Sequence, residues 1–494
     1  MAQSLAIFVV VSSLVIGTTA CKAPAPTDDR PNLVMIVLDT VRPDYLSAYG
    51  HPRPTSPFLE SLVASGRRFD RAYSSSSWTL PAHGSLFTGT VPAVHRANQK
   101  ERRLADSLPT LAERLGEAGY QTAAFSGNSW VQEPSGLARG FDHFENLMDG
   151  YYLPHVERLA KDEAGEIALT PEDHYIGSSV RTWLTDTREP RRPFFVFVNL
   201  VEPHLPYLPD WKTASEFVAS KEIRWQAIRK YYPDASGGPI LKRFYARRLP
   251  LTEAEWEVLR SLYEGEIRAA DAVAGAIVEA VDSISDPDDT LVFVLSDHGE
   301  NFGEHGHFTH LFNLYDTNLR IPLIVRGPGF RPGSVEPRRV QILDLYPTLL
   351  SVAGLAPDPS LRGVDLRSSV PEDRVLTASL AYPEISLKNF PAVFSRLGLL
   401  DDYKVALDVA IGPRFKLIRY ADRSGRLVKE ELYDLLDDPD ELRPLSPDAV
   451  DAAALERLRG ALGGQEAAAT DSTSDPLEDP KYLESLKALG YIED

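Results

Sequence analysis

The sequence contains a single cysteine, Cys21, among its 494 residues. It can therefore form no intramolecular disulfide, even in an oxidising compartment. The stability of the fold must rest on a buried core, together with any metal that the chain binds. Apolar residues make up 43% of the chain and charged residues 25%, a balance typical of globular proteins rather than of disordered or membrane-embedded ones.

Basic residues are scarce relative to acidic ones. The chain has 52 Lys and Arg against 71 Asp and Glu, which gives a formal net charge of -19. Because no basic stripe is present to neutralise phosphates, we exclude nucleic acid as a partner. An anionic substrate would need the local help of a cation or metal.

Long hydrophobic runs are absent apart from residues 5–17, a stretch that is short for a membrane span. Residues 1–20 are typical of a signal peptide, and the sequence TTAC at 18–21 resembles a bacterial lipobox, in which Cys21 would carry the lipid. No Lys or Arg precedes the apolar run and Thr18 stands where Leu is usual, so cleavage by an ordinary signal peptidase stays open. We expect an exported protein on the periplasmic or cell-envelope side, anchored to the membrane at Cys21, with residues 21–31 as anchor and linker.

Short apolar runs alternate with helical patterns, which indicates an α/β fold with a large mixed, mostly parallel sheet sandwiched by helices. We expect a catalytic domain at 32–356, a small C-terminal α+β subdomain at 357–462, and a linker with a C-terminal helix at 463–494. The predicted strands are 32–38, 122–126, 194–200, 290–295, 321–325, 414–420 and 431–435. The predicted helices are 107–118, 252–283, 447–462 and 481–491.

Polar side chains follow three predicted strands at the edge where open α/β sheets bind ligands. Asp39 follows the strand at 32–38, His204 comes shortly after the strand at 194–200, and Asp297 and His298 follow the strand at 290–295. Thr79 precedes an apolar run and is predicted to cap a helix. Its hydroxyl would complete a four-ligand site for one divalent cation with the two aspartates and His298. The sequence does not decide whether this cation is calcium, magnesium, manganese or zinc.

The segment SWTLPAHGSLFTG at 77–89 resembles the active-site loop of the sulfatase family, which reads Cys-x-Pro-x-Arg and then Leu-x-Thr-Gly. The resemblance covers most of the chain beyond residue 30. It is carried further by DTVRPD at 39–44, GYQT at 119–122, SDHGE at 296–300, GEHG at 303–306 and DLYPTLL at 344–350. It implies the alkaline-phosphatase superfamily fold and a hydrolase acting on phosphoric or sulfuric ester bonds.

Thr79 stands at the position where sulfatases carry the Cys or Ser that becomes formylglycine, and threonine cannot undergo that conversion. The resemblance therefore implies direct attack by the Thr79 hydroxyl, as in the phosphodiesterase and phosphotransferase branches of the superfamily. His83 replaces the motif Arg, and SGN at 126–128 replaces a Lys-bearing segment. These changes weaken the case for sulfate hydrolysis.

The resemblance also implies roles for further residues. His204 is the leading candidate for the acid that protonates the leaving group, and His310 is the second. His83 is a further catalytic candidate on the substrate side. The candidates for substrate binding are His305, Arg42 and Asn128.

We expect an exported, metal-dependent hydrolase of phosphate mono- or diesters. The alternative is a sulfuric ester hydrolase, and further alternatives are an envelope phospho-alcohol transferase or an inactive metal-binding homologue. The substrate would be a small-molecule, glycan or lipid ester, whose alcohol part is selected by the variable loops at 151–172 and 211–249. The sequence leaves the oligomeric state open.

Overall fold

The computed structural model describes residues 30–463, apart from 168–169, 172, 246–250, 387–395, 397 and 399, together with Leu483. The predicted signal peptide, Cys21 and the predicted helix at 481–491 lie outside the described residues. Within the described part of the chain, no helix combines the length and the apolar character needed to cross a membrane.

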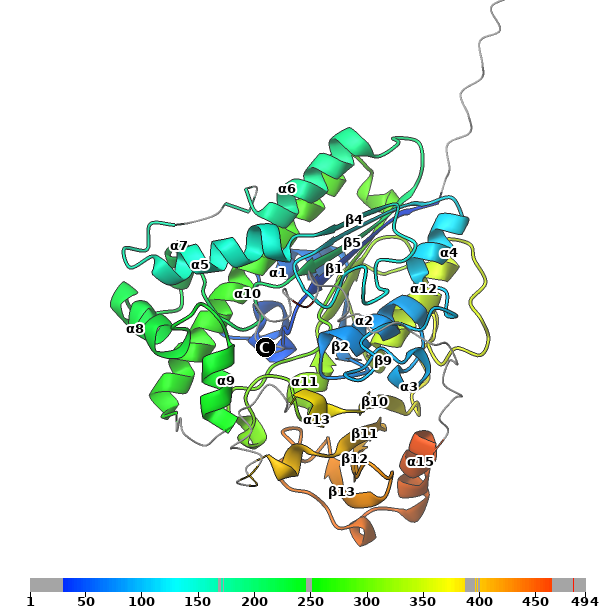
Figure 1. Cartoon of the computed structure of the whole chain (residues 1–494). Coiled ribbons are helices and arrows are strands. Elements are labelled where there is room, and N and C mark those ends of the chain that lie inside the picture. Colours follow the sequence, from blue (N-terminus) through cyan, green and yellow to red (C-terminus); the bar gives the residue numbers. More distant parts are fainter. Residues whose placement is uncertain are drawn as a thin grey trace, which may run out of the picture.

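The main body is built on a nine-stranded mixed sheet with helices on both faces (Figure 1). The strand order is β4-β3-β5-β1-β6-β8-β2-β7, and β9 pairs with β2. Neighbours from β4 to β6 run parallel, which confirms the predicted fold class. The strands are β1 (Asn32–Leu38), β2 (Arg67–Tyr73), β3 (Gln121–Ser126), β4 (His143–Asn146), β5 (Phe194–Leu200), β6 (Thr290–Leu295), β7 (Arg320–Ile321), β8 (Leu323–Arg326) and β9 (Ser334–Gln341).

The central strands are nearly continuous apolar runs because both of their faces are covered. Alternate side chains of β1 pack into two separate cores, one on each side of the sheet. In the register of β1 with its two neighbours, Leu38 lies opposite Leu200 and Val37 opposite Leu295. The backbone N–H of Asp39 continues this ladder by donating to the Leu200 carbonyl at 2.8 Å. The residues that follow the three strands therefore meet at one edge.

Helices α2, α4 and α12 cover one face of the sheet, and α1, α5, α6 and α10 cover the other (Figure 1). The long α10 begins with a capping box, in which Thr252 and Glu255 exchange hydrogen bonds. The helices are α1 (Pro57–Ser65), α2 (Thr79–Thr88), α3 (Pro92–His95), α4 (Leu111–Glu117), α5 (Leu153–Lys161), α6 (Tyr175–Thr182), α7 (Trp211–Ala214), α8 (Lys221–Tyr231), α9 (Gly238–Tyr245), α10 (Glu253–Asp282), α11 (Asp316–Leu319), α12 (Leu345–Val352), α13 (Pro383–Ser386) and α15 (Ala452–Gly463).

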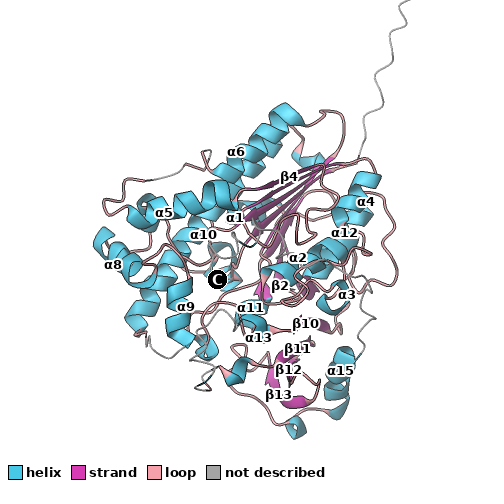
Figure 2. Ribbon diagram, viewed as in Figure 1, coloured by secondary structure: helices cyan, strands magenta, loops and turns pink. Residues whose placement is uncertain are grey.

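A smaller antiparallel sheet follows toward the C-terminus, in the order β10 (Leu376–Leu380), β11 (Ala406–Ile411), β12 (Phe415–Ala421) and β13 (Leu427–Asp434) (Figure 2). One of its faces joins the core that also contains β1 side chains, and the other packs against α15. The fully buried Lys416 of β12 ties this sheet to the main body, because its ammonium lies 2.7 Å from Asp316 and 2.6 Å from Glu441.

The predicted helix at 107–118 is shorter in the structure, and α4 begins only at Leu111. Pro109 disfavours a helical conformation in the residue before it. Thr110 then caps the helix by accepting the backbone N–H of Glu113 at 3.1 Å.

Two other predicted elements are interrupted. The strand at 321–325 is split into β7 and β8 at Pro322, which has no N–H to give to a ladder. The helix at 447–462 begins only at Ala452, after a short turn of 3-10 helix. Strands β2, β4, β9, β10 and β11 were not predicted, because charged or small residues interrupt their apolar patterns.

Candidate active site

Asp39, Asp297 and His298 meet at the sheet edge where β1 and β6 end. One ligand atom of each lies within 4.8 Å of the others, and all three side chains are buried. Thr79 approaches from α2, with its Oγ1 3.5 Å from His298 Nε2. The structure thus brings together the four residues predicted as metal ligands.

Thr79 is not the helix cap that the sequence predicted. Helix α2 begins at Thr79 itself, and the extended Trp78 occupies the cap position without a side-chain hydrogen bond. The Thr79 hydroxyl is consequently turned into the site, where it accepts from Asn128 Nδ2 at 3.4 Å. The start of α2 adds partial positive charge at this point, which favours an anion there.

Each of the two carboxylates keeps one buried oxygen without a hydrogen-bond partner. Asp39 accepts from Asn128 at 2.7 Å through Oδ2, and its Oδ1 is unpartnered. Asp297 accepts backbone N–H groups of Thr40 at 3.2 Å and His298 at 2.9 Å through Oδ1, and its Oδ2 is unpartnered. Such orphaned oxygens are the donor atoms that a divalent cation takes.

The electrostatics of the carboxylates also fit a cation. Burial raises the pKa of Asp297 to about 7, and burial together with the charge of Asp297 raises the pKa of Asp39 to about 7. Two like charges in a dry site are costly unless a positive charge lies between them. Asp39, Thr79, Asp297 and His298 would hold that cation.

His298 has the protonation state and orientation of a metal ligand. Its Nδ1 lies 3.0 Å from the carbonyl oxygen of Gly299, and burial lowers the pKa of the ring to about 4. In the neutral ring Nδ1–H donates to that carbonyl, so the lone pair is on Nε2. Nε2 faces Thr79 and lies 3.3 Å from Asp297 Oδ2.

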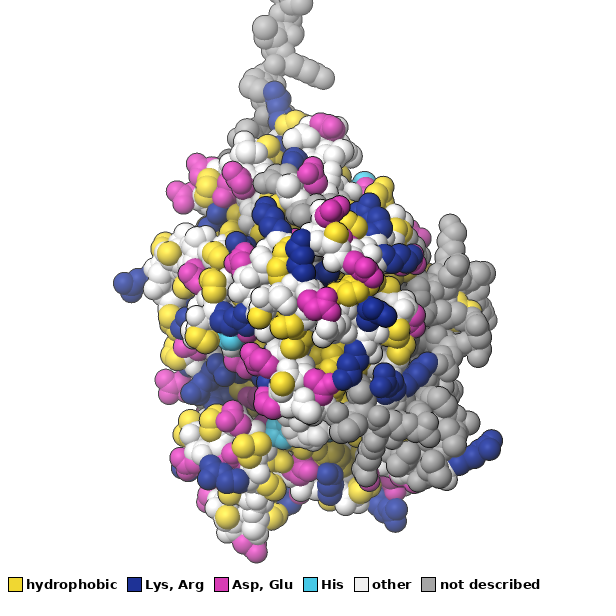
Figure 3. Space-filling view, turned by 90° about the vertical axis from the view of Figure 1, so that its left-hand side faces the viewer, with side chains coloured by type: hydrophobic (Ala, Val, Ile, Leu, Met, Phe, Trp, Pro, Cys, Tyr) yellow, Lys and Arg dark blue, Asp and Glu magenta, His cyan; other side chains and the backbone are white. Residues whose placement is uncertain are grey.

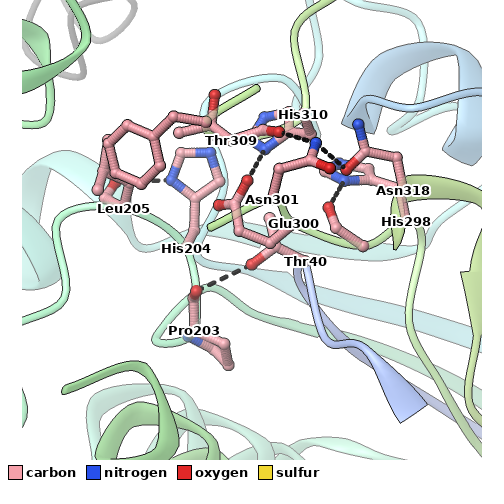
Figure 4. A network of polar contacts seen from close by, with 12 residues as sticks. Thr40, Pro203, His204, Leu205, His298, Glu300, Asn301, Thr309, His310 and Asn318 are labelled. Atoms are coloured by element: carbon pink, nitrogen blue, oxygen red, sulfur yellow. Dashed lines mark hydrogen bonds and ion pairs between the residues drawn. The ribbon is translucent and has the colours of Figure 1, made fainter. Parts of the chain in front are cut away.

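Two residues near the metal ligands have structural contacts that limit their roles. The hydroxyl of Thr40 donates to the Pro203 carbonyl at 2.9 Å and so turns away from the site (Figure 4). Asn128, predicted to bind substrate, bridges Asp39 and Thr79, and its Oδ1 accepts the backbone N–H of Trp130 at 2.8 Å. That second bond fixes the direction of the Asn128 amide.

A histidine pair lies next to the metal ligands (Figure 4). The ring centroid of His310 is 4.4 Å from that of His298 and 5.2 Å from that of His204. His310 Nδ1 lies 3.1 Å from Oε1 of the fully buried Glu300, whose Oε2 accepts from the Tyr207 hydroxyl at 2.9 Å. His204 Nδ1, in contrast, contacts the backbone carbonyl of Leu205 at 2.7 Å.

Sequence reasoning missed the roles of Glu300, Tyr207 and Asn199. Glu300 stands in the quoted SDHGE motif, but the motif does not show that its carboxylate meets His310. Asn199 is an internal residue of β5, and its Nδ2 reaches Asp39 Oδ2 at 3.4 Å. Only the three-dimensional packing makes these partners visible.

Three further predicted residues, Arg42, His83 and His305, lie around this centre, and none of their side chains belongs to the metal-ligand group. The Arg42 guanidinium pairs with Asp44 and Glu304, both at 2.7 Å. His83 is fully buried in α2, and its Nδ1 lies 2.9 Å from the Thr79 carbonyl oxygen. Its ring meets the rings of Phe87 and Phe197 edge-on. His305 stacks on Tyr315 at a centroid distance of 3.7 Å. Their contact with a substrate stays a prediction.

Comparisons with known proteins agree with this geometry. A model of the sulfatase family matches residues 31–355, and a model of the C-terminal part of N-sulphoglucosamine sulphohydrolase matches residues 303–467. Arylsulfatase K of Mus musculus is 23% identical over 87% of this chain and 80% of its own length. Delta 4,5-hexuronate-2-O-sulfatase of Bacteroides thetaiotaomicron is 24% identical over 87% of this chain and 88% of its own.

A solved structure has the same fold. The phosphonate monoester hydrolase of Agrobacterium radiobacter superposes with a TM-score of 0.65 at 22% identity, covering 88% of this chain and 94% of that one. The chain belongs to the sulfatase family. It is a hydrolase of this family, whose enzymes use a divalent metal.

Metal binding should depend on pH through Asp39 and Asp297. Their folded pKa of about 7 exceeds the ordinary 3.8, so the metal-free folded state binds more protons than the unfolded state between about pH 4 and 7. The stability of the metal-free protein should therefore fall as pH rises through this window, and a cation should reverse that fall. Thermal unfolding with each of Mg²⁺, Mn²⁺, Ca²⁺ and Zn²⁺ should show a larger metal-induced rise in Tm at pH 8 than at pH 5.5.

The Asp39→Asn variant is the control, because it removes one carboxylate at nearly constant volume. It should lose most of the metal-induced rise in Tm at pH 8. An equal rise at the two pH values, or an equal rise in the variant, would contradict the assignment of these carboxylates.

Proposed function

We propose that this protein hydrolyses phosphate esters with Thr79 as the nucleophile. The observation that carries the proposal is the position of the Thr79 hydroxyl, at the start of α2 and 3.5 Å from Nε2 of His298, which lies in one cluster with the two aspartates that each keep an unpartnered oxygen. A divalent cation bound there would supply positive charge that lowers the pKa of a nearby hydroxyl and polarises an ester oxygen.

The chain's own residues then have distinct tasks. The Thr79 hydroxyl gives its proton to solvent, and Oγ1 forms a bond to phosphorus as the bond from phosphorus to the alcohol oxygen breaks. That oxygen takes a proton from a protonated histidine. Asn128 holds Asp39 and the Thr79 hydroxyl in place. Water finally cleaves the phosphothreonine and restores the hydroxyl.

Phosphate is favoured over sulfate because of the nucleophile. Formylglycine releases sulfate through collapse of a hemiacetal, and a sulfated threonine has no such route. Threonine phosphate, in contrast, can be opened by water at phosphorus. The chemistry of residue 79 therefore separates this chain from the sulfatases that it resembles.

The charge balance favours an ester with a single negative charge. The two aspartates would be neutralised by a divalent cation, His298 is neutral, and the charge of Arg42 is already balanced by Asp44 and Glu304. A phosphodiester fits such a site better than a dianionic monoester. A sulfate monoester has the same single charge, and sulfatases are among the relatives, so sulfate hydrolysis is the second candidate.

Replacement of the nucleophile tests the proposal. With metals added singly, we expect the purified protein to turn over bis-nitrophenyl phosphate faster than nitrophenyl phosphate, and nitrophenyl sulfate most slowly. Thr79→Ala should lower kcat for the phosphate esters by about a thousandfold or more, and Thr79→Ser should keep part of the activity because it retains the hydroxyl.

Each contrary result has a clear meaning. Full activity in Thr79→Ala would exclude Thr79 as the nucleophile, and reaction of the sulfate ester alone would favour a sulfatase. Metal binding with no turnover of the three esters would favour a phospho-alcohol transferase or an inactive metal-binding homologue.

The contacts of the two histidines favour His310 as the proton donor over His204, which ranks first from the sequence alone. Glu300 Oε1 lies 3.1 Å from His310 Nδ1 and can accept from it, which opposes the burial that lowers the pKa of His310 to about 3. His204 Nδ1 has a backbone carbonyl at the corresponding place. We therefore expect His310→Ala to lower kcat/KM by about a hundredfold or more for an alkyl ester and by less than about tenfold for a nitrophenyl ester, which needs little protonation. The matched variant is His204→Ala. A larger loss with the alkyl ester in His204→Ala than in His310→Ala would reverse the assignment.

We also propose that the chain is exported and anchored through a lipid on Cys21, as the sequence of residues 1–21 suggests. Fractionation of cells that produce the whole chain should place it with membranes, and the Cys21→Ala form should be lost from that fraction. Membrane retention of the variant would point instead to an uncleaved apolar anchor.

A further inference from the structure

Thr309, the residue directly before His310, has an unusual backbone conformation. Its φ is 61°, in the left-handed region that glycine adopts freely and a β-branched residue rarely does. Among the described residues, seven residues other than glycine have a positive φ, and only Thr40 and Thr309 of these are β-branched. Backbone strain of this kind persists only where surrounding contacts compensate for it.

Both threonines adjoin the candidate active site (Figure 4). Thr40 directly follows Asp39, and its N–H and its hydroxyl are both hydrogen-bonded. Thr309 directly precedes His310, and the contacts that hold its backbone come from Asn301. The two strained residues thus direct the chain next to groups on which the site depends.

Asn301 bonds to the backbone of Thr309 on both sides of its Cα atom. The Thr309 N–H donates to the Asn301 backbone carbonyl at 3.0 Å, and Asn301 Nδ2 donates to the Thr309 carbonyl. Both residues are buried, so water does not compete for these bonds. Together the two bonds fix the direction in which the chain enters and leaves Thr309.

The side-chain amide of Asn301 is itself held in place. Its Oδ1 accepts from the Thr317 hydroxyl at 2.6 Å, and its Nδ2 also donates to Asn318 Oδ1 at 2.9 Å. The backbone of the same two segments is paired as well, because the N–H groups of Gly299 and Glu300 donate to the carbonyls of Asn318 and Thr317 at 2.8 and 3.1 Å. Both N–H groups of the amide are therefore used within the protein.

The residue before Thr309 is anchored separately. Phe308 is fully buried, its ring centroid lies 5.3 Å from that of Trp256, and its carbonyl accepts from the Tyr245 hydroxyl at 2.6 Å. With Phe308 fixed, the backbone angles of Thr309 decide where the ring of His310 lies. A negative φ at Thr309 would send the chain in another direction and take His310 Nδ1 away from its partner Glu300.

We propose that Asn301 is a positioning residue for His310. By holding Thr309 at a positive φ, Asn301 directs the imidazole toward Glu300 and the metal-ligand group. Its part in the reaction rests on the proposed function, in which His310 protonates the leaving oxygen. Because Asn301 acts through His310, its loss should slow reactions that need this proton and spare reactions that do not.

Two diesters of equal charge separate these cases. Diphenyl phosphate needs protonation of its leaving oxygen, whereas bis-nitrophenyl phosphate needs little. Acidic and basic side chains are intermingled on the face that Figure 3 shows, so the surface field does not favour either ester. Asn301→Ala should lower kcat/KM by about tenfold or more for diphenyl phosphate and by less than about threefold for bis-nitrophenyl phosphate.

A second substitution should reverse this loss. Glycine adopts a positive φ without being held there, so the double variant of Asn301→Ala with Thr309→Gly should recover most of the activity toward diphenyl phosphate. The double variant should also fold if Asn301→Ala alone does not, because it removes the strain that Asn301 offsets.

The matched control is Asn318→Ala. It removes another fully buried asparagine of the same network, whose side chain bonds to Asn301 and Asn313. This variant should lose thermal stability, but the ratio of the two kcat/KM values should stay that of the unmodified protein. A merely structural role of Asn301 predicts the same result for Asn301→Ala.

A second measurement needs no turnover. In the metal-free protein labelled with ¹⁵N-histidine, the NMR signals of the His310 ring are identified by their absence from His310→Ala. They should shift in Asn301→Ala, return in the double variant and stay in place in Asn318→Ala.

Unchanged His310 signals, or equal losses with the two esters, in a folded Asn301→Ala variant would overturn the proposal. A double variant that does not fold or does not recover would also overturn it, since Asn301 would then support the loop as a whole. Equal slowing of both esters in His310→Ala would remove the acid assignment and this inference together. Failure of the Thr79 proposal is recognised separately, as full activity in Thr79→Ala with the response of the His310 signals to Asn301→Ala intact.

Discussion

The burial of two carboxylates side by side, Asp39 and Asp297, is the constraint on which the rest of the site depends. Both lie at the ends of central parallel strands whose register is fixed by backbone pairing on either side of β1. In each carboxylate one oxygen accepts hydrogen bonds from the protein, and the other oxygen has no donor. The fold therefore holds together a pair of groups whose ionisation lowers the stability of the metal-free protein and is offset by a cation, and this couples metal binding to the stability of the sheet edge.

The neighbouring side chains are arranged around that pair by the same dry environment. Burial keeps His298 neutral, so its Nε2 is a ligand rather than a competing positive charge. The hydroxyl of Thr40 turns toward a backbone carbonyl, and Asn128 is held by the backbone of Trp130. Both side chains are neutral and add no charge to the site. Arg42, which follows β1 three residues after Asp39, is balanced by Asp44 and Glu304. The substrate thus meets a centre with little net charge once a divalent cation is bound.

The sequence predicts the central strands well, because β1, β5 and β6 are buried on both faces and read as unbroken apolar runs. The four predicted metal ligands lie close together in the structure, and their binding of a metal stays a prediction. The sequence fails for β2 and β9, whose charged residues interrupt the pattern. It also places Thr79 at a helix cap, because Thr is a common capping residue, whereas the extended Trp78 takes that position. The partnership of Glu300 with His310 depends on how a loop folds back on itself, and no periodicity or spacing reveals it.

The fold alone does not decide which ester is cleaved, since sulfatases and a phosphonate hydrolase share it. Under the proposed mechanism the decision rests on residue 79, because the route by which an enzyme releases the transferred group is set by the atom that carries it. A formylglycine hydrate expels sulfate from its own carbon, and so water need not attack sulfur. A threonine has no second oxygen on its Cβ, so the intermediate must be opened at phosphorus or sulfur, and phosphorus is the centre that accepts a second in-line attack under a divalent cation more readily. In this proposal a single side chain changes which substrates the same arrangement of strands, carboxylates and histidines can turn over.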